Sequence, residues 1–366
     1  LSLSSTEISS LYLAATLLAA APLTYLGGLT DRWGLYRSAI VAVLGIATAC
    51  AVAASVQHVA ALLVAFWLMR MIGSGTLTLI ANNTLAHWFH RRLGMASSAM
   101  QLGMAGAIAF APGLMLALIG MVGWREAYWL LAALLACVLA PLIAFTYREP
   151  SDNGGSKAVG GLKARNDAAP ETHDATLGEA MRTAPFWVLH ATIGAWALIG
   201  TALMFHLEAV FHSRGATAAQ SAWATTVMAV GVASLQLSGG ILADRLGVRP
   251  LLAAAMTAIA GGCLTIGLSQ GAVSLLAGYA FYGAGQGMMT IVASVGWPRY
   301  FGRSHLGRIR GTATTSAVAC SSMGPLALGA SIDHGGIETA FWGFAATAFV
   351  LAVISGYVLA PHTPRH

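Results

Sequence analysis

The sequence predicts an all-α polytopic membrane protein, and three observations carry this prediction. Of its 366 residues, 57% are hydrophobic and only 9% are charged, whereas a soluble globular domain is about a quarter charged. The apolar residues fall in long blocks, and a block of about 20 residues crosses a bilayer core as a helix that satisfies its own backbone hydrogen bonds. Finally, the second half of the chain repeats the first.

Eleven apolar blocks are expected to form membrane-spanning helices. They cover Ile8–Leu26, Ser38–Val56, Val59–Leu85, Gly94–Val122, Glu126–Thr146, Ala184–Phe211, Ala218–Leu242, Arg249–Leu268, Ala272–Val295, Gly311–Ile332 and Ile337–Leu359. The one long polar connection, residues 147–183, is rich in Gly, Ser, Asp and Lys and is typical of a flexible linker. It divides the chain into an N-terminal bundle, residues 1–146, and a C-terminal bundle, residues 184–366.

The two bundles repeat at an offset of 212 or 213 residues. Residues 27–34 (GGLTDRWG) correspond to residues 240–247 (GILADRLG), and three further pairs of stretches follow in the same order. These pairs are IGSGTLT at 72–78 with AGQGMMT at 284–290, WF at 88–89 with YF at 300–301, and AYW at 127–129 with AFW at 340–342. Parallel repeats of six-helix units occur in one large class of transporters. Because the counterpart of Ala184–Phe211 would precede Leu1, we expect the first of twelve helices to be absent and number the spans 2 to 12.

The positive charges are strongly asymmetric about these spans. Sixteen Lys and Arg residues fall on one set of connections, and only Arg125 and Arg214 fall on the other. By the positive-inside rule, the first set is cytoplasmic, so the linker and the C-terminus lie in the cytoplasm of a multi-pass protein of the inner or plasma membrane. The sixteen are Arg32, Arg37, Arg91, Arg92, Arg148, Lys157, Lys163, Arg165, Arg182, Arg245, Arg249, Arg299, Arg303, Arg308, Arg310 and Arg365.

The repeated phrases GGLTDRWGLYR (27–37) and GILADRLGVR (240–249) resemble the signature loop of the major facilitator superfamily, which follows spans 2 and 8. The resemblance implies two six-helix bundles and a cytoplasmic gate, in which Asp31 and Asp244 brace the cytoplasmic side while the cavity faces outward. The glycines would allow close helix approach and a tight turn. In the alternative, the two arginines merely anchor the loops to lipid headgroups. The gate residues are Gly27, Asp31, Arg32, Gly34, Gly240, Asp244, Arg245 and Gly247.

Three further stretches narrow the resemblance. WFHRRLGMASSAMQLGMAG (88–106), GWREAYW (123–129) and YFGRSHLGRIRG (300–311) resemble bacterial members of the monocarboxylate-porter-like branch, which includes the oxalate–formate exchangers. The spans themselves depart from that branch. Span 8 lacks the Asp-Arg pair of proton-coupled monocarboxylate porters, and spans 8 and 11 lack the basic residues of the oxalate exchanger. Lactate and oxalate are therefore not implied as substrates.

Arg70 is the leading candidate for substrate binding. In the fold that the resemblance implies, spans 1, 4, 7 and 10 line the central cavity, and Arg70 lies near the middle of span 4 in FWLMRMIGSG. A charged side chain at that depth is costly unless it faces a cavity or a partner. An arginine can hold a carboxylate through two parallel hydrogen bonds. Two alternatives stay open: a role in proton coupling, and a structural pairing with the absent first span.

Other polar residues in the spans are weaker candidates for the cavity wall. Each of them has a helix–helix hydrogen bond as the alternative explanation. Tyr282 occupies the repeat position of Arg70, and one turn further along span 10 lies Gln286. The remaining two, in spans 5 and 8, are Gln101 and Gln236.

Two titratable residues near the outer end of span 7 are candidates for proton coupling. His206 and Glu208 stand in MFHLEAVFH (204–212), and histidine titrates near neutral pH. The alternative places both side chains in a wet outer vestibule.

These features predict a secondary active transporter that moves a small solute by alternating access. A cavity centred on an arginine and poor in acids favours a small organic anion such as a carboxylate. The alternative is proton-driven efflux of drug-like compounds or metabolites by the same superfamily. No nucleophile–base set and no metal-ligand spacing is visible in the sequence, so we expect no enzyme activity, no cofactor and no metal. The expected partners are the solute, protons or a counter-anion, and membrane lipid, with no nucleic acid and a monomeric state.

Overall fold

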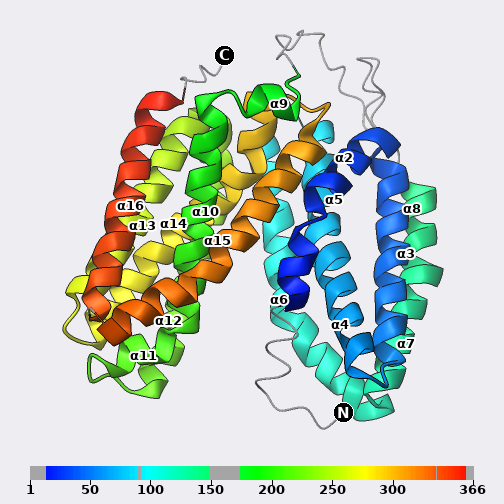
Figure 1. Cartoon of the computed structure of the whole chain (residues 1–366), viewed down its shortest axis with the longest axis horizontal. Coiled ribbons are helices and arrows are strands. Elements are labelled where there is room, and N and C mark those ends of the chain that lie inside the picture. The colour runs from blue at the N-terminus through cyan, green and yellow to red at the C-terminus, as the bar shows by residue number, and fades with distance from the viewer. Residues whose placement is uncertain (1–13, 90–91, 148–173, 335, 360–366) are drawn as a thin grey trace. The chain divides into compact units, whose positions relative to one another are not determined.

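The computed structural model describes residues 14–89, 92–147, 174–334 and 336–359, and these residues form helices joined by short connections (Figure 1). The beginning of predicted span 2 and most of the linker lie outside the described residues. The helices of the first half are α2 (Leu23–Trp33), α3 (Leu35–Ala54), α4 (Val59–Leu68), the π-helix η1 (Met69–Leu77), α5 (Thr78–Trp88), α6 (Leu93–Val122), α7 (Trp124–Leu134), the π-helix η2 (Leu135–Leu139) and α8 (Ala140–Thr146).

The second half follows the same plan. Its helices are α9 (Leu177–Ala180), α10 (Ala184–Phe205), α11 (Leu207–His212), α12 (Ala218–Leu246), α13 (Val248–Leu268), α14 (Ala272–Phe301), α15 (Leu306–His334) and α16 (Ile337–Val358). Among the described residues, eight helical stretches are long and apolar enough to cross a membrane. They coincide with predicted spans 3, 4, 6, 7, 8, 9, 11 and 12, and spans 5 and 10 form the 30-residue helices α6 and α14.

The ends of the helices follow from local residues. α12 begins with a capping box in which the Thr217 backbone N–H donates to Gln220 Oε1 at 2.8 Å while Gln220 N–H donates to the Thr217 hydroxyl at 3.4 Å. At the gate loops, α2 and α12 each stop at a glycine, Gly34 with φ 80° and Gly247 with φ 86°. Only glycine adopts this left-handed conformation without strain. The second glycine of each repeated phrase therefore turns the chain directly into the next helix.

Two compact units make up the chain. The first comprises residues 1–90, 107–177 and 298–315, and the second comprises residues 91–106, 178–297 and 316–366. This division differs from the one at the linker in two short stretches. The beginning of α6 belongs with the second unit, and the beginning of α15 belongs with the first. α6 and α15 are thus divided between the units, and the last turn of α14, from Pro298, also belongs with the first unit.

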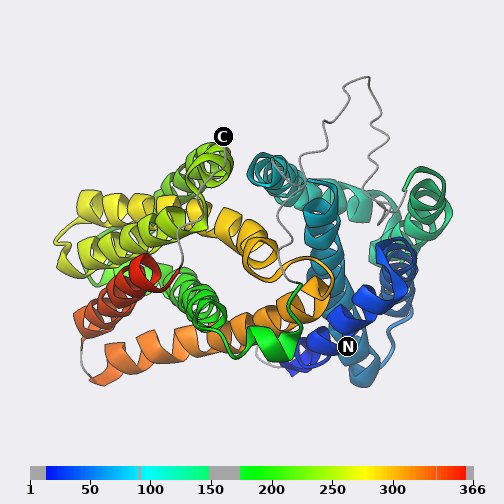
Figure 2. The same cartoon turned by 90° about the horizontal axis from the view of Figure 1, so that it is seen from above.

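Within each unit the helices pack through small side chains. In the first unit α3 lies along α7, and Ala39 and Ala42 on α3 are buried against Ile80 of α5. In the second unit α16 packs along α13 and α10 (Figures 1 and 2). Large apolar side chains remain exposed on both units, including Phe145 at 87% and Tyr357 at 84%. In a membrane protein, lipid covers such side chains.

Arg310 departs from the sequence-based expectation. It was expected in the connection before span 11, because the apolar block starts at Gly311. The helix begins earlier, at Leu306, and the Arg310 side chain is only 4% exposed inside it. Hydropathy detects where apolar residues begin, whereas the helix itself begins where its first N–H groups find acceptors. The prediction for this residue was therefore wrong, and it does not belong among the charges of the loops.

Candidate functional site

The carboxylate of Asp31 caps the N-terminus of α15. Its Oδ1 accepts a hydrogen bond from Gly307 N–H at 2.8 Å, and its Oδ2 accepts one from Arg308 N–H at 2.9 Å. The backbones approach so closely that a Cβ on Gly27 would overlap the Gly307 carbonyl. Burial raises the pKa of the Asp31 carboxyl above its ordinary value, although the two N–H donors act in the opposite direction. Asp31 is therefore a half-buried acceptor at a helix end.

Asp244 repeats this arrangement in the second unit. Its Oδ1 accepts from Gly94 N–H at 2.8 Å, and its Oδ2 accepts from Met95 N–H at 3.0 Å, in the first turn of α6. Here too the backbones touch, because a Cβ on Gly94 would overlap the Gly240 carbonyl. The first N–H groups of a helix have no partner within the helix and carry the positive end of its dipole. Both signature loops thus supply the missing acceptor to a helix that lies far away in the sequence.

The arginines of the two gate loops behave differently from the aspartates. Arg32 and Arg245 are both exposed. Exposed cations at the end of a span are placed well for lipid headgroups. The structure therefore separates two roles within one phrase: the aspartate reaches a helix end inside its unit, and the arginine faces outward.

Asp174 makes a further set of hydrogen bonds to backbone N–H groups, which the sequence analysis missed. Its Oδ1 accepts from the backbone N–H groups of Arg303 at 2.7 Å and Ser304 at 3.4 Å, and its Oδ2 accepts from the Ser304 hydroxyl. The next residue, Ala175, donates to Phe301 O at 3.0 Å. Burial disfavours the charge, but the hydrogen bonds prevail and lower the pKa of Asp174. The end of the linker is thereby tied to the connection that precedes α15.

Arg303 holds the same connection from the other side. Its Nε donates to the carbonyl of Ala86, near the C-terminal end of α5, at 2.5 Å. A cation beside the last carbonyls of a helix is favoured by the helix dipole. Asp174 stands in no motif and in no periodic apolar pattern, and Arg303, although it lies in the family-like stretch 300–311, was singled out only as one of the loop charges.

Arg70 lies in the π-helix η1, in the middle of the helical path from Val59 to Trp88. Its side chain is half-buried. Its carbonyl accepts a hydrogen bond from the Ser74 hydroxyl at 2.9 Å, and the Thr76 hydroxyl donates to Met71 O at 3.0 Å. π-helical turns are rare and often mark functional sites. The arginine that the sequence singled out thus stands on an irregular turn.

The other cavity candidates differ in burial. Tyr282 is only 1% exposed, and its hydroxyl lies so close to α10 that a Cβ on Gly200 would stand 2.5 Å from it. Gln286 and Gln101 are half-buried. The two glutamines are thus partly exposed, whereas Tyr282, which lies on α14, is enclosed against α10.

Gln236 belongs to a buried group of hydrogen bonds in the second unit. Its Nε2 donates to the Thr290 hydroxyl at 3.1 Å, and its backbone carbonyl accepts from the Ser98 hydroxyl. One turn away the hydroxyls of Ser97 and Ser294 lie 2.8 Å apart. These contacts join the beginning of α6 to α12 and α14. The arrangement favours the helix-packing role that the sequence left open for Gln236.

His206 is the residue that joins α10 to α11, and Glu208 lies in the first turn of α11. His206 Nε2 lies 3.0 Å from the carbonyl of Pro325 on α15. The Glu208 side chain is exposed. The histidine therefore contacts a neighbouring helix, whereas the glutamate has the position expected of a residue in a wet vestibule.

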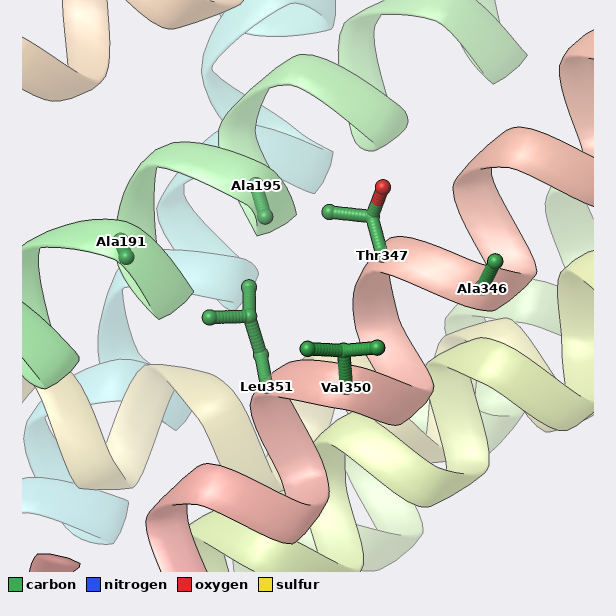
Figure 3. A pocket seen from close by; sticks show the side chains of 6 residues that line it. All are labelled: Ala191, Ala195, Ala346, Thr347, Val350 and Leu351. Atoms are coloured by element: carbon green, nitrogen blue, oxygen red, sulfur yellow. The ribbon is translucent and has the colours of Figure 1, made fainter.

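An apolar groove of about 460 Å³ lies elsewhere, between α10 and α16 (Figure 3). Ala191 and Ala195 border it from α10, and residues 346, 347, 350 and 351 border it from α16. Its lining contains the Thr347 hydroxyl and otherwise only hydrocarbon side chains. None of the predicted site residues lines it.

Comparison with known proteins gives a family match over the whole chain. The sequence profile of the Major Facilitator Superfamily matches residues 1–213 and 195–366. An uncharacterised major facilitator transporter of Mycobacterium tuberculosis is 30% identical over 144 residues. That match covers 39% of this chain and 25% of the relative, so the chain spans only a quarter of the length of that protein.

Solved structures with the same fold include transporters for different solutes. The Escherichia coli fucose:proton symporter FucP has a TM-score of 0.73 at 18% identity and covers 95% of this chain and 90% of its own. The human organic anion transporter MFSD10 reaches 0.70 at 18% identity, covering 94% and 82%. The proton:xylose symporter XylE reaches 0.69 at 13% identity, covering 98% and 86%. At these identities the likeness establishes the fold.

Proposed function

The chain belongs to the Major Facilitator Superfamily, and we propose that it is a secondary transporter that carries a small organic anion bound at Arg70. The observation that carries the proposal is the position of this arginine. It is the one Lys or Arg in the middle of a described span, and it is half-buried on a π-helical turn. A planar guanidinium at membrane depth matches a carboxylate, to which it can donate two parallel hydrogen bonds.

The structural relatives leave the solute class open. Their names include an organic anion transporter, a fucose symporter and a xylose symporter, so the shared fold favours none of these classes. The motifs of the monocarboxylate-porter-like branch support an anion, and so does Arg70. Among the other candidates, Gln286 and Gln101 are half-buried and suit polar contacts with the solute.

We assign the two signature loops to the gate of the transport cycle. Asp31 and Asp244 hold helix ends through hydrogen bonds to backbone N–H groups. Such bonds are charge-assisted and are lost as a pair when the helix end moves away. Each loop therefore suits a latch that stabilises one state of the transporter and opens in another.

A ligand-dependent thermal shift tests the proposal. The purified protein and its Arg70→Gln variant are melted with organic anions, neutral sugars, amino acids and lipophilic cations. A ligand that binds the folded state stabilises it by about 2.7 kcal/mol at a hundredfold excess over Kd. We expect carboxylates to raise Tm of the wild type and to have little effect on Arg70→Gln, because the variant cannot neutralise the anion.

Arg37→Gln is the matched control, because it removes one positive charge from an exposed position outside the candidate site. It should respond to carboxylates as the wild type does. If lipophilic cations stabilise the wild type and Arg70→Gln equally and carboxylates stabilise neither, the anion proposal fails and the efflux alternative takes its place.

A further inference from the structure

α15 carries a proline in its interior, and a neighbouring helix satisfies the carbonyl that this proline leaves open. Pro325 has no N–H, so it cannot donate to the carbonyl four residues earlier, that of Ser321. The Thr201 hydroxyl of α10 lies 2.7 Å from Ser321 O. The same hydroxyl also lies 2.8 and 3.0 Å from the Ala197 and Leu198 carbonyls of its own helix, so Ser321 O is its nearest acceptor. The break in α15 is thus repaired from α10.

A second donor, His206 at the C-terminal cap of α10, reaches the proline itself. His206 Nε2 lies 3.0 Å from Pro325 O. A carbonyl can only accept, so Nε2 carries the hydrogen in this contact. The imidazole ring also lies 3.6 Å from the position of a Cβ on Gly329. Thr201 therefore binds the carbonyl four residues before the proline, and His206 binds the carbonyl of the proline itself.

The two helices are in direct backbone contact between these hydrogen bonds. A Cβ on Gly324 would overlap the Leu198 carbonyl and stand 2.7 Å from the Thr201 hydroxyl. One turn earlier in α15, the sulfur of Cys320 lies 3.0 Å from the position of a Cβ on Gly194. Only glycine permits such an approach. α10 and α15 are therefore joined over several turns, all within the second unit (Figure 1).

We propose that Thr201, His206 and Gly324 form a clasp that makes α10 and the C-terminal part of α15 one rigid element of the transport cycle. Asp31 holds α15 at its other end, through Gly307 and Arg308. The clasp implies that α15 stays joined to α10 when Asp31 releases that end. The proposal does not depend on the identity of the solute.

A double-mutant cycle tests whether the clasp repairs the proline break. Thr201→Val keeps the shape of the side chain but removes the donor to Ser321 O, and we expect Tm to fall by about 2–4 °C. In Pro325→Ala the N–H of residue 325 returns to Ser321 O. Thr201→Val should then cost little in that background, because the threonine has become redundant. An equal loss in both backgrounds would overturn the repair. Thr201→Ser, which retains a hydroxyl, should stay close to the wild type.

A cross-link tests whether the joined helices move as one element. Gly194→Cys places a thiol opposite Cys320, with the two Cβ atoms 3.7 Å apart, inside the 3.5–4.5 Å that a disulfide needs. In the Asp31→Asn variant, amide hydrogen exchange at Gly307 and Arg308 should rise about tenfold because two hydrogen bonds are weakened. We expect this rise to be the same with the disulfide formed or reduced.

Two results of the exchange experiment would overturn the rigid element. The first is that forming the disulfide suppresses the rise in exchange at the N-terminus of α15. The second is that exchange at residues 321–329 rises together with exchange at that N-terminus. His206→Gln keeps an N–H donor and should leave exchange at residues 326–329 unchanged, whereas His206→Ala should increase it. An increase of the same size in both variants would remove His206 from the clasp.

Discussion

At the scale of single residues, the aspartate and the arginine of each signature loop make different contacts. Asp31 and Asp244 each place two oxygens on two successive N–H groups of a distant helix, whereas Arg32 and Arg245 are exposed. A carboxylate can accept on both oxygens, and an amide can accept on one only. The ionised form of aspartate is therefore what the two helix ends require.

Replacing these aspartates by asparagine should open the helix ends one at a time. Asp244→Asn should raise hydrogen exchange at Gly94 and Met95 about tenfold, because one acceptor is lost and the other loses its charge. Asp31→Asn should act on Gly307 and Arg308 in the same way. Arg32→Gln is the matched control and should leave all four amides protected. If Arg32→Gln raises exchange as much as the aspartate variants do, the loops are held by their arginines and not by their aspartates.

The Asp174 contact should depend on pH. Its pKa is lowered in the folded protein, despite some burial, by hydrogen bonds from Ser304 and Arg303. Its contribution to stability is then fully present above the ordinary carboxyl pKa of about 3.9 and is lost as the pH falls through the lowered value. Asp174→Asn should therefore lower Tm at neutral pH, and the difference from the wild type should close in acid. Asp167→Asn, which removes the same charge elsewhere in the linker, is the control. A difference that stays constant with pH would contradict the role of the charge.

At the scale of elements, the two repeats cap equivalent helix C-termini, those of α3 and α13, with arginines from different positions. The carbonyls at the C-terminal end of a helix attract a cation. In the first unit Arg125 Nη2 donates to Val56 O, just after α3, at 3.3 Å. The repeat position of Arg125 is Glu338, and this glutamate pairs at 2.9 Å with Arg214, which donates at 3.2 Å to Gly267 O at the end of α13. The two arginines that violate the charge asymmetry of the loops are thus both helix caps.

An arginine at position 338 should therefore be able to cap the C-terminus of α13 in place of Arg214. Arg214→Ala should destabilise the protein by about 1 kcal/mol or less, because the pair is partly exposed. Adding Glu338→Arg to this variant recreates the arrangement of the first repeat and should recover Tm. Glu338→Arg alone should lower Tm because two like charges then meet. If the double variant is no more stable than Arg214→Ala, the two positions are not equivalent.

The π-helix η1 has a counterpart in the numbering of the repeats. The offset between them is 213 at Gly34 and 212 at Gly73, so the first half holds one residue more between these glycines than the second half holds between Gly247 and Gly285. A π-helical segment bonds each carbonyl to the N–H five residues on, and it accommodates an additional residue without breaking the helix. The corresponding helix α14 is α-helical throughout. The additional residue thus coincides with the turn that carries Arg70.

At the scale of the whole molecule, the charge asymmetry predicts the orientation in the membrane. Ser304 and Ser213 are both exposed and stand in connections on opposite sides of the predicted spans. A membrane-impermeant maleimide added to intact cells should label Ser213→Cys and should label Ser304→Cys only after lysis. The wild type is the control, since its four cysteines lie in predicted spans. Labelling of Ser304→Cys in intact cells would invert the topology.

The fold was predictable because its causes are visible locally. Apolar block length gives the spans, and the repeated phrases mark the two signature loops, although the helix ends that their aspartates reach lie far away in the sequence. Asp174 and Thr201 were not predictable in this way, because their partners lie more than a hundred residues away. The burial of Arg310 was not predictable because α15 begins before the apolar block does. The change of offset from 213 to 212 was a signal for the irregular turn, although a change of offset alone does not reveal how the chain accommodates it.

The hydrogen bonds of Asp31 and Asp244 also determine which positions tolerate substitution. The groups that receive Asp31 and Asp244 are main-chain amides, and every amino acid except proline brings such an amide. Met95 and Arg308 can therefore exchange for most other side chains without loss of the hydrogen bond, while a proline at either position removes it. We therefore expect few substitutions to be tolerated at Asp31 and Asp244, and most substitutions to be tolerated at Met95 and Arg308.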